Sequence, residues 1–192
     1  MLASLAPPPV VQPGMVYEPK YDGIRALVDL RPATKDTPVH VEVYSRNGHA
    51  KSHQFPAIVA ALKRLAPKLD GPVLLDGEIV ATDSKGRPLA FGRLQGRIHL
   101  TAATDIARAE KAQPAALVVF DLLRDDDRDI RGLSMAARRL RLQDALPVKT
   151  GGVALVRLSE IVADDGRAML ARAEREGWEG LIGKDGGSVY HS

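Results

Sequence analysis

The sequence predicts an α+β fold built on antiparallel sheet, and three observations lead to this prediction. Segments with strand patterns and segments with helical spacing follow each other in mixed order, which favours antiparallel pairing over strict β–α–β alternation. The residues are 45% hydrophobic and 27% charged, a balance typical of a globular protein and not of a disordered one. A chain of 192 residues is also long enough to bury a full hydrophobic core in about one domain.

Six segments are predicted strands. The clearest is residues 39–44, in which Val39, Val41 and Val43 alternate with His40, Glu42 and Tyr44, as in a half-buried strand. The other predicted strands are rich in β-branched and apolar residues, and they are residues 24–30, 74–80, 116–122, 153–156 and 180–182.

Three segments are predicted helices. The first is indicated by apolar residues that share one helical face, namely Phe55, Ile58, Val59, Leu62 and Leu65. Ser134 is a predicted N-cap for a second helix, which carries Ala137 and Leu140. Residues 164–176 are predicted to form a third helix that ends at Gly177.

Residues 1–14 are rich in proline and are predicted to be an extended lead-in, and residues 15–192 are predicted to be one domain. The first residues lack a basic segment ahead of an apolar one, so they do not resemble a signal peptide. No stretch approaches the ~18 apolar residues that a membrane helix needs, so we expect a cytoplasmic protein that does not bind membranes.

Composition excludes several kinds of site. The chain has no cysteine, which excludes disulfides, thiolate metal sites and a cysteine nucleophile. The net charge is only +3, so total charge does not by itself indicate nucleic-acid binding. Of the 27 basic residues 18 are arginine, which suits bidentate phosphate contacts, although a GC-rich coding bias produces the same excess.

The segment Glu18-Pro19-Lys20-Tyr21-Asp22-Gly23-Ile24-Arg25 is the first candidate site. Pro19 disfavours a helix and Asp22-Gly23 is typical of a turn, so Lys20 is predicted to lie on a loop that enters a strand. A nucleophilic lysine needs a lowered pKa, and the charged neighbours of Lys20 can tune its amine. The alternative is a surface turn with solvated charges.

Two further segments combine acids with apolar strands. Asp76 and Glu78 interrupt the run at residues 74–80, and Glu179 opens a run that Lys184 closes. A buried acid costs several kcal/mol unless it is paired or metal-bound, and a hard cation such as Mg²⁺ prefers oxygen ligands. The alternatives are an Asp-Gly hairpin turn at residues 76–77 and an ordinary helix–strand connection at Glu179.

Phe120 lies in the apolar segment Val118-Val119-Phe120-Asp121-Leu122-Leu123 and is one of only three phenylalanines in the chain. An aromatic face can stack on a base, whereas an aromatic residue in an apolar strand is more commonly part of the core. Both interpretations are open from this segment alone.

Taken in order, these segments resemble the motif ladder of the covalent nucleotidyltransferases. The ladder runs Lys20-x-Asp22-Gly23-x-Arg25, Ser45-Arg46-Asn47-Gly48, Asp76-Gly77-Glu78, Phe120-Asp121 and Glu179-Gly180-x-x-x-Lys184. Over residues 15–190 the chain is similar to the adenylation domain of ATP-dependent DNA ligases, most of all to the bacterial end-joining ligase D group. This resemblance implies an ATP-grasp-like nucleotidyltransferase fold with antiparallel or mixed sheets flanked by helices.

The resemblance implies a specific reaction. Lys20 would attack the α-phosphate of ATP, form lysyl-AMP and release pyrophosphate; the AMP would pass to a DNA 5′-phosphate, and a 3′-hydroxyl would seal the nick. The implied cofactors are ATP and Mg²⁺ or Mn²⁺, and the implied partner is nicked or broken double-stranded DNA. Non-homologous end joining in the bacterial cytosol or nucleoid would be its setting.

The same resemblance assigns positions around the nucleotide. These are Glu18 at the adenine edge, Asp22 and Gly23 in the lysine loop, Arg25 and Arg46 at the nucleotide or DNA phosphate, Glu78 at the ribose, Phe120 stacked on adenine, and Lys184 at a phosphate. The metal is assigned to Glu78 and Glu179.

The chain departs from the family pattern at its end. In the family a fifth motif with two lysines and then an OB-fold domain follow, but no lysine follows Lys184 here. We therefore expect an adenylation domain cut short of its fifth motif, whose missing part is an OB-fold domain or a partner chain. We also expect weak or absent self-adenylation by the chain alone, because losing preorganised cations costs about 10²-fold or more in rate.

The remaining polar features are predicted to have lesser roles. The run Asp125, Asp126, Asp127 and Asp129 is predicted to be a solvated turn, and Trp178 a packing anchor. The arginines of the second helix are predicted either to contact DNA phosphates or to form a solvated face, and they are Arg138, Arg139 and Arg141. The five histidines lack metal-ligand spacing and are assigned no role.

Two other functions remain open from the sequence. One is an RNA ligase or a capping-type nucleotidyltransferase, which shares the motif ladder. The other is a non-catalytic module that recognises nicks or nucleotides, because the fifth motif is absent.

Overall fold

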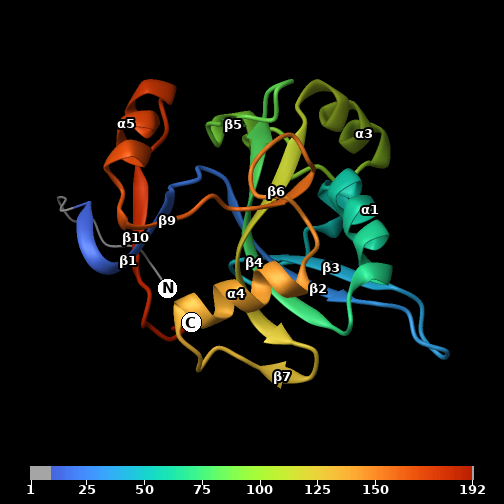
Figure 1. Cartoon of the computed structure of the whole chain (residues 1–192). Helices are drawn as coiled ribbons and strands as arrows, with labels where there is room; N and C mark the ends of the chain where they lie inside the picture. Colours follow the sequence, from blue (N-terminus) through green and yellow to red (C-terminus); the bar gives the residue numbers. More distant parts are fainter. Residues whose placement is uncertain (1–9, 192) are drawn as a thin grey trace.

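A computed structural model describes residues 10–191 and shows helices arranged around two sheets (Figure 1). The predicted α+β class, with antiparallel and mixed sheets flanked by helices, is confirmed. The strands are β1 Val11–Pro19, β2 Ile24–Arg31, β3 His40–Ser45, β4 Val73–Thr82, β5 Pro88–Leu89, β6 Ala115–Asp125, β7 Arg128–Asp129, β8 Val156–Leu158, β9 Val162–Asp165 and β10 Leu181–Asp185. The helices are α1 Pro56–Leu65, α2 Gly92–Gln95, α3 Ala103–Ala112, α4 Met135–Ala145 and α5 Arg167–Glu176, with 3-10 turns at Ser52–Gln54 and Ala66–Lys68.

Within residues 10–191, seven strands form the central sheet. Its main path is β3-β2-β4-β6-β7, while β5 pairs with β4 and β8 pairs with β6. All of its ladders are antiparallel except that of β6 with β8, which is parallel. The sheet is therefore mixed, with its two longest strands, β4 and β6, at its centre.

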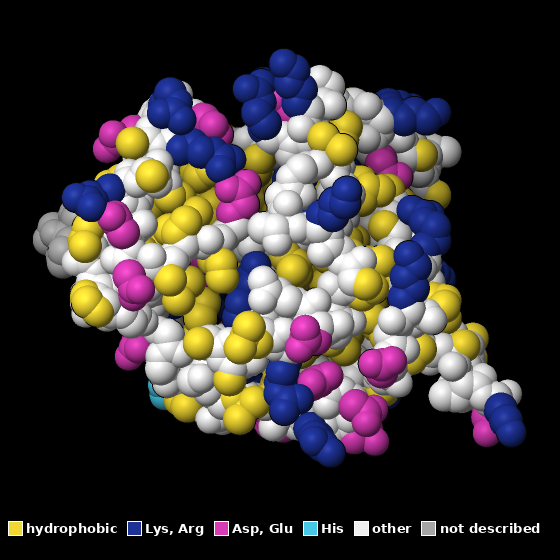
Figure 2. Space-filling view, viewed as in Figure 1, with side chains coloured by type: hydrophobic (Ala, Val, Ile, Leu, Met, Phe, Trp, Pro, Cys, Tyr) yellow, Lys and Arg dark blue, Asp and Glu magenta, His cyan; other side chains and the backbone are white. Residues whose placement is uncertain are grey.

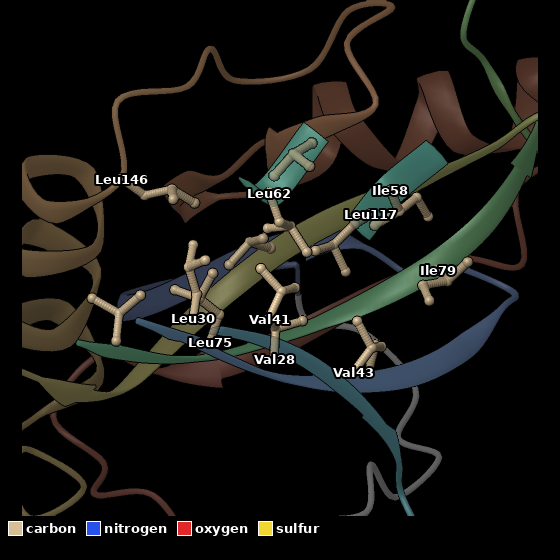
Figure 3. Close-up of a cluster of buried hydrophobic side chains, with 14 of the residues drawn as sticks. Val28, Leu30, Val41, Val43, Ile58, Leu62, Leu75, Ile79, Leu117 and Leu146 are labelled. Carbon is tan, nitrogen blue, oxygen red and sulfur yellow. The ribbon is translucent and has the colours of Figure 1, made fainter. Parts of the chain in front are cut away.

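The central sheet has one apolar face and one polar face. Alternate residues of β2, namely Ala26, Val28 and Leu30, are buried in the main hydrophobic cluster. They belong to the same cluster as Ile58 and Leu62 from α1. Figure 3 shows Val28, Leu30, Ile58 and Leu62 between the helix and the sheet. Because successive side chains of a strand point to opposite faces, the residues between them point away from this core. That second face carries the candidate site.

A smaller sheet lies beside the central one, with the order β10-β1-β9 (Figure 1). The antiparallel ladder of β1 and β10 extends to the pair Pro19–Leu181, so the residues after β1 lie beside those before β10. Helix α5 connects β9 to this region and ends at Gly177, whose φ of 70° is the left-handed conformation that glycine adopts readily. The predicted end of this helix is confirmed.

Helix α4 confirms one sequence prediction and corrects another. Ser134 caps the helix as predicted, because its hydroxyl accepts a hydrogen bond from the amide of Ala137 at 3.2 Å. However, Arg138 and Arg139 are buried, with 2% and 4% exposure, while Leu140 is 63% exposed. The predicted solvated or DNA-contacting face at these two arginines is therefore wrong, since they lie at helical spacing with the buried Met135 and Leu142.

Three boundaries differ from the sequence predictions. The strand predicted at residues 153–156 begins only at Val156, because the glycines before it adopt left-handed φ angles and Val153 is 71% exposed. The helix predicted from residue 164 begins at Arg167, because strand β9 extends to Asp165. The predicted lead-in at residues 1–14 falls mostly on residues 1–9, which lie outside the described residues, and β1 already begins at Val11.

Two further predictions concern turns. The acidic run after Leu123 forms the β6–β7 turn as predicted, with Asp126 at a positive φ of 56°. The alternative of a hairpin turn at residues 76–77 is wrong, because both lie in the middle of β4.

Helix α3 is not predicted by the sequence, since Ile106 is its only buried residue and gives no apolar stripe.

In the described part of the chain, no helix is both long and apolar enough to cross a membrane.

The core makes a prediction for two leucines of the same helix. Leu142→Ala should lower the free energy of unfolding by about 2–5 kcal/mol, because the fully buried side chain leaves a cavity. Leu140→Ala is the matched control and should change it by less than about 0.5 kcal/mol, since Leu140 is exposed. Urea unfolding measures both, and equal losses would contradict this arrangement of α4.

Candidate functional site

Lys20 lies on the loop between β1 and β2, where the two sheets meet. Its backbone amide donates a hydrogen bond to the carbonyl of Gly180 at 2.9 Å, and its ammonium group pairs with the carboxylate of Glu179. The side chain is one-third exposed and lines a hollow of about 260 Å³ together with Asp22 and Trp178. The first and last motifs of the sequence thus meet at this lysine.

The loop after Lys20 is fixed by two contacts. The carboxylate of Asp22 accepts a hydrogen bond from the amide of Phe91 at 2.9 Å. A Cβ atom on Gly23 would stand 2.2 Å from the carbonyl oxygen of Ile79, so only glycine fits here. These contacts hold the loop against the segment after β5 and against β4.

The polar face of the central sheet brings the next motifs together. Arg25 is the cross-strand partner of Glu78, and Leu27 is the partner of Asp76. The side chain of Asp76 is fully buried, and Arg25 binds both of its oxygens, with an Nε–Oδ1 distance of 2.5 Å. Arg25 is therefore held in a forked ion pair beside Glu78.

A segment distant in sequence completes this ion pair. The hydroxyl of Tyr190 donates a hydrogen bond to Oδ2 of Asp76 at 2.9 Å and accepts one from Arg25 at 3.4 Å. Burial and the charge of Asp76 raise the pKa of Tyr190 to about 12, so the phenol keeps its proton at neutral pH. Arg138 lies over the Tyr190 ring at 5.7 Å and is itself paired with Asp121.

Glu78 carries the largest shift among the predicted acidic site residues. Burial raises the pKa of its carboxyl group to about 8, and the charges of Asp76 and Asp22 act in the same direction. Arg25 and the amide of Gly23 oppose this shift. The carboxyl group is therefore largely protonated at pH 7.

Phe120 lies at a bulge of β6. Asp76 pairs with Asp121 and Gly77 pairs with Val119, so Phe120 is the extra residue of β6 at this point. A bulge re-aims a side chain, and the Phe120 ring lies 5.0 Å from the guanidinium carbon of Arg25 and 4.7 Å from Nζ of Lys184. Phe120 is thus only partly buried and belongs to the polar site.

Lys184 links the small sheet to this site. Its ammonium group pairs with the carboxylate of Glu18, which is only 2% exposed. Glu18 and Lys184 belong to β1 and β10, whose ladder places residue 18 opposite Ile182. The predicted residues Glu18, Lys184, Phe120 and Arg25 therefore form one connected group.

Arg46 is the one predicted residue that the structure does not bring into contact with the others. It lies exposed in the turn after β3. Since Ser45 pairs with Ala26, residue 46 lies at the same end of the ladder as Arg25. Its position is compatible with a ligand that extends over this edge of the sheet.

Glu78 and Glu179 are the two residues to which the sequence assigns a metal. Among residues 10–191, no group of three or more acids or histidines is suited to hold a metal. Mg²⁺ does not require such a group, because it takes one or two carboxylates and completes its shell with water and substrate phosphates. The two glutamates offer the hard oxygen donors that Mg²⁺ prefers, so the residues present fit a cation shared with a phosphate ligand.

Sequence reasoning missed two residues of the site as partners of Arg25. The sequence indicates Asp76 only as an acid in an apolar run, and it assigns no role to Tyr190. The alternation of β4 could have placed Asp76 on the polar face with Glu78. No local pattern indicates that Tyr190 folds back onto Asp76, because that contact spans 114 positions.

Comparisons with known proteins show which family the sequence resembles. A family model described as "ATP dependent DNA ligase domain" matches residues 1–192. A DNA ligase of Pyrobaculum calidifontis is 34% identical over 91% of this chain and 28% of its own length. The multifunctional non-homologous end joining protein LigD of Pseudomonas aeruginosa is 34% identical over 92% of this chain and 18% of its own length.

Solved structures show the same likeness. The ligase domain of M. tuberculosis LigD has a TM-score of 0.66 and 29% identity, and the match covers 92% of this chain and 50% of that one. A mycobacterial DNA ligase D complexed with ATP and MES has a TM-score of 0.67 and 28% identity, with the same coverage. The chain thus spans about half of these structures and less than a third of the two curated relatives.

Glu78 makes stability depend on pH. Its pKa is raised in the folded chain, so the folded state holds a proton that the unfolded state loses as pH rises from about 4.5 to about 8. Glu78→Gln removes this penalty, and its advantage in unfolding free energy over the wild type should grow by about 1–4 kcal/mol between pH 5 and pH 9. The exposed Glu174→Gln is the control, and a pH-independent difference for Glu78→Gln would contradict the assignment.

Tyr190 makes a second prediction. Tyr190→Phe should lower the free energy of unfolding by about 1–3 kcal/mol, because the buried carboxylate of Asp76 loses a hydrogen bond. Tyr44→Phe is the matched control, since the Tyr44 hydroxyl forms no hydrogen bond with the described residues. Chemical denaturation at pH 7 measures both variants. An unchanged free energy of unfolding for Tyr190→Phe would show that the contact with Asp76 does not stabilise the fold.

Proposed function

The chain belongs to the family of ATP-dependent DNA ligase domains, and on this premise we propose that it is the part of an ATP-dependent DNA ligase that carries AMP on Lys20. The observation that carries the proposal is the position of Lys20, on a fixed loop at the meeting point of the two sheets, beside Glu179 and a hollow. Arg25, Phe120 and Lys184 lie together on the adjoining face.

In the proposed reaction the amine of Lys20 attacks the α-phosphate of ATP. A phosphorus–nitrogen bond forms, the bond to the bridging oxygen breaks, and pyrophosphate leaves. The amine must first lose its proton, and Glu179 is the carboxylate in contact with it. The AMP then passes to the 5′-phosphate of nicked or broken duplex DNA, and a 3′-hydroxyl displaces it to seal the strand.

The other residues bind and orient in this proposal. Phe120 offers its ring to the adenine, and Glu18 meets the edge of the base from β1. Asp76 binds only Nε and Nη2 of Arg25, so Arg25 can offer its remaining guanidinium nitrogen to a phosphate. Arg46 extends the phosphate contacts at the same end of the sheet.

Glu78 and Glu179 would hold Mg²⁺ in this proposal. When bound, the cation supplies positive charge that offsets the charge of the phosphates. Glu78 is largely protonated at pH 7 because burial raises its pKa more than Arg25 lowers it, and a neighbouring cation favours its ionised form.

The proposed function predicts one labelled residue. With α-labelled ATP and Mg²⁺, the label should lie on Lys20, because this lysine has the contacts described above. Lys20→Ala should abolish the label, whereas Lys35→Ala, which changes an exposed lysine of the β2–β3 turn, should retain it. Peptide mass spectrometry locates the adduct.

Label that persists in Lys20→Ala would overturn the proposal. Pre-adenylated nicked duplex DNA provides a second test, because sealing it does not require the first step. Failure of the chain both to form the lysyl adduct and to seal this substrate would favour a module that binds nicks or nucleotides without turnover.

A further inference from the structure

Arg157 lies on the same face of the central sheet as the candidate site. It is the middle residue of β8, and its neighbours Val156 and Leu158 belong to the hydrophobic core. Successive side chains alternate between faces, so Arg157 points to the polar face. The pairs Arg25–Glu78, Glu78–Val118 and Val118–Arg157 then place these residues in one row across four strands.

The charge of Arg157 has no carboxylate partner. The residue is 3% exposed, and its Nη1 donates a hydrogen bond to the carbonyl of Gly152, but it forms no ion pair with any residue from 10 to 191. The carboxylate that influences its pKa is that of Glu160, which is already bound by Arg172 at 2.6 Å. Burial lowers the pKa of Arg157, which reflects the cost of an uncompensated cation.

This cation lines a hollow that adjoins Lys20. The hollow measures about 130 Å³, and it shares Pro19, Tyr21, Pro88 and Trp178 with the larger hollow beside Lys20. Lys85, Arg87 and Arg172 also line it, along with Glu160 and Glu176. Figure 2 shows basic side chains on both rims of the recess between the α5 lobe and the region of β5.

Several of these cations are already paired. Arg172 is bound by Glu160 and Glu176 and stacks on Trp178 at 4.6 Å, and Arg87 pairs with Asp83. Arg157 and Lys85 form no ion pair among the described residues. With Arg87 balanced by Asp83, the three cations Arg157, Lys85 and Arg172 face the two carboxylates of Glu160 and Glu176, so the hollow keeps one net positive charge. Its two cations without an ion pair are a buried guanidinium and an exposed ammonium group, a combination suited to a small anion.

We propose that the hollow lined by Arg157 is a phosphate-binding subsite next to Lys20. Its ligand is a phosphoryl group, supplied either by the polyphosphate tail of the nucleotide or by a phosphodiester of the DNA strand. These two sources rest on the proposed function, whereas the anion site itself rests on Arg157, Lys85 and the hollow.

The test compares Arg157→Gln with the wild type and with Arg64→Gln, which changes an exposed arginine of α1. Glutamine removes the charge but can still donate a hydrogen bond to Gly152. Pyrophosphate affinity is measured by calorimetry, and affinity for nicked duplex DNA is measured over a range of salt concentrations. Arg157→Gln should weaken one of these by about tenfold or more, while Arg64→Gln leaves both unchanged.

The two sources give different results. If the nucleotide tail is the ligand, pyrophosphate binding weakens and DNA binding is retained. If the DNA backbone is the ligand, DNA binding weakens and its logarithmic salt slope falls by about 0.9, as for one lost phosphate contact.

Unchanged affinity for both probes in a folded Arg157→Gln variant would overturn the inference, as would a wild type that binds neither probe. If Arg157→Gln does not fold, Lys85→Gln provides the test on an exposed residue, and no loss of affinity there would overturn it equally. Labelling of Lys20 and sealing of pre-adenylated nicked DNA are measured in parallel. Failure of both counts against the proposed function, while unchanged phosphate affinity counts against the subsite alone.

Discussion

One buried carboxylate organises the candidate site. The Asp76 side chain is fully buried, and a charge in that position is tolerated only where partners offset its desolvation. Those partners are Arg25 of β2 and Tyr190 of the segment that follows β10. The need to satisfy Asp76 therefore ties the end of the described chain to the central sheet. It also fixes the guanidinium of Arg25 beside Phe120, where the nucleotide is proposed to bind.

The two faces of the central sheet have different roles, because one forms the hydrophobic core and the other carries the candidate site. Its apolar face packs against α1 and needs no polar partner, whereas its other face carries Arg25, Asp76 and Glu78. Alternation in β6 places Phe120 on this face, because its neighbour Val119 belongs to the core. The bulge adds one extra residue between Val119 and Asp121, so Asp121, the partner of Asp76, faces the same side. A local irregularity thus brings a further carboxylate to the face that carries the aromatic ring.

The strands of the central sheet could be predicted from the sequence where alternation is regular, as at Val41 and Val43, which are both buried. The ordered set of motifs also indicated Lys20 and Glu179, and the structure brings these two side chains together. The prediction failed at Arg138 and Arg139, since arginine is rarely buried and the partners of these two residues are distant in sequence. Tyr190 and Arg157 were beyond local patterns for the same reason, because only tertiary packing decides what they face.

Two largely buried ionisable residues of the polar face, one acid and one base, lack an ion-pair partner in the part of the chain that the structure describes. Glu78 is an acid that burial keeps largely protonated at pH 7, and Arg157, in the same row, is a buried cation without a carboxylate partner among the described residues. Each imbalance costs folding free energy, so neither is explained by stability. A ligand that brings anionic phosphates together with a cation would relieve both, because the phosphate would pair with the arginine and the cation would favour the ionised acid. Groups fixed in advance for such charges are what an electrostatically preorganised site requires.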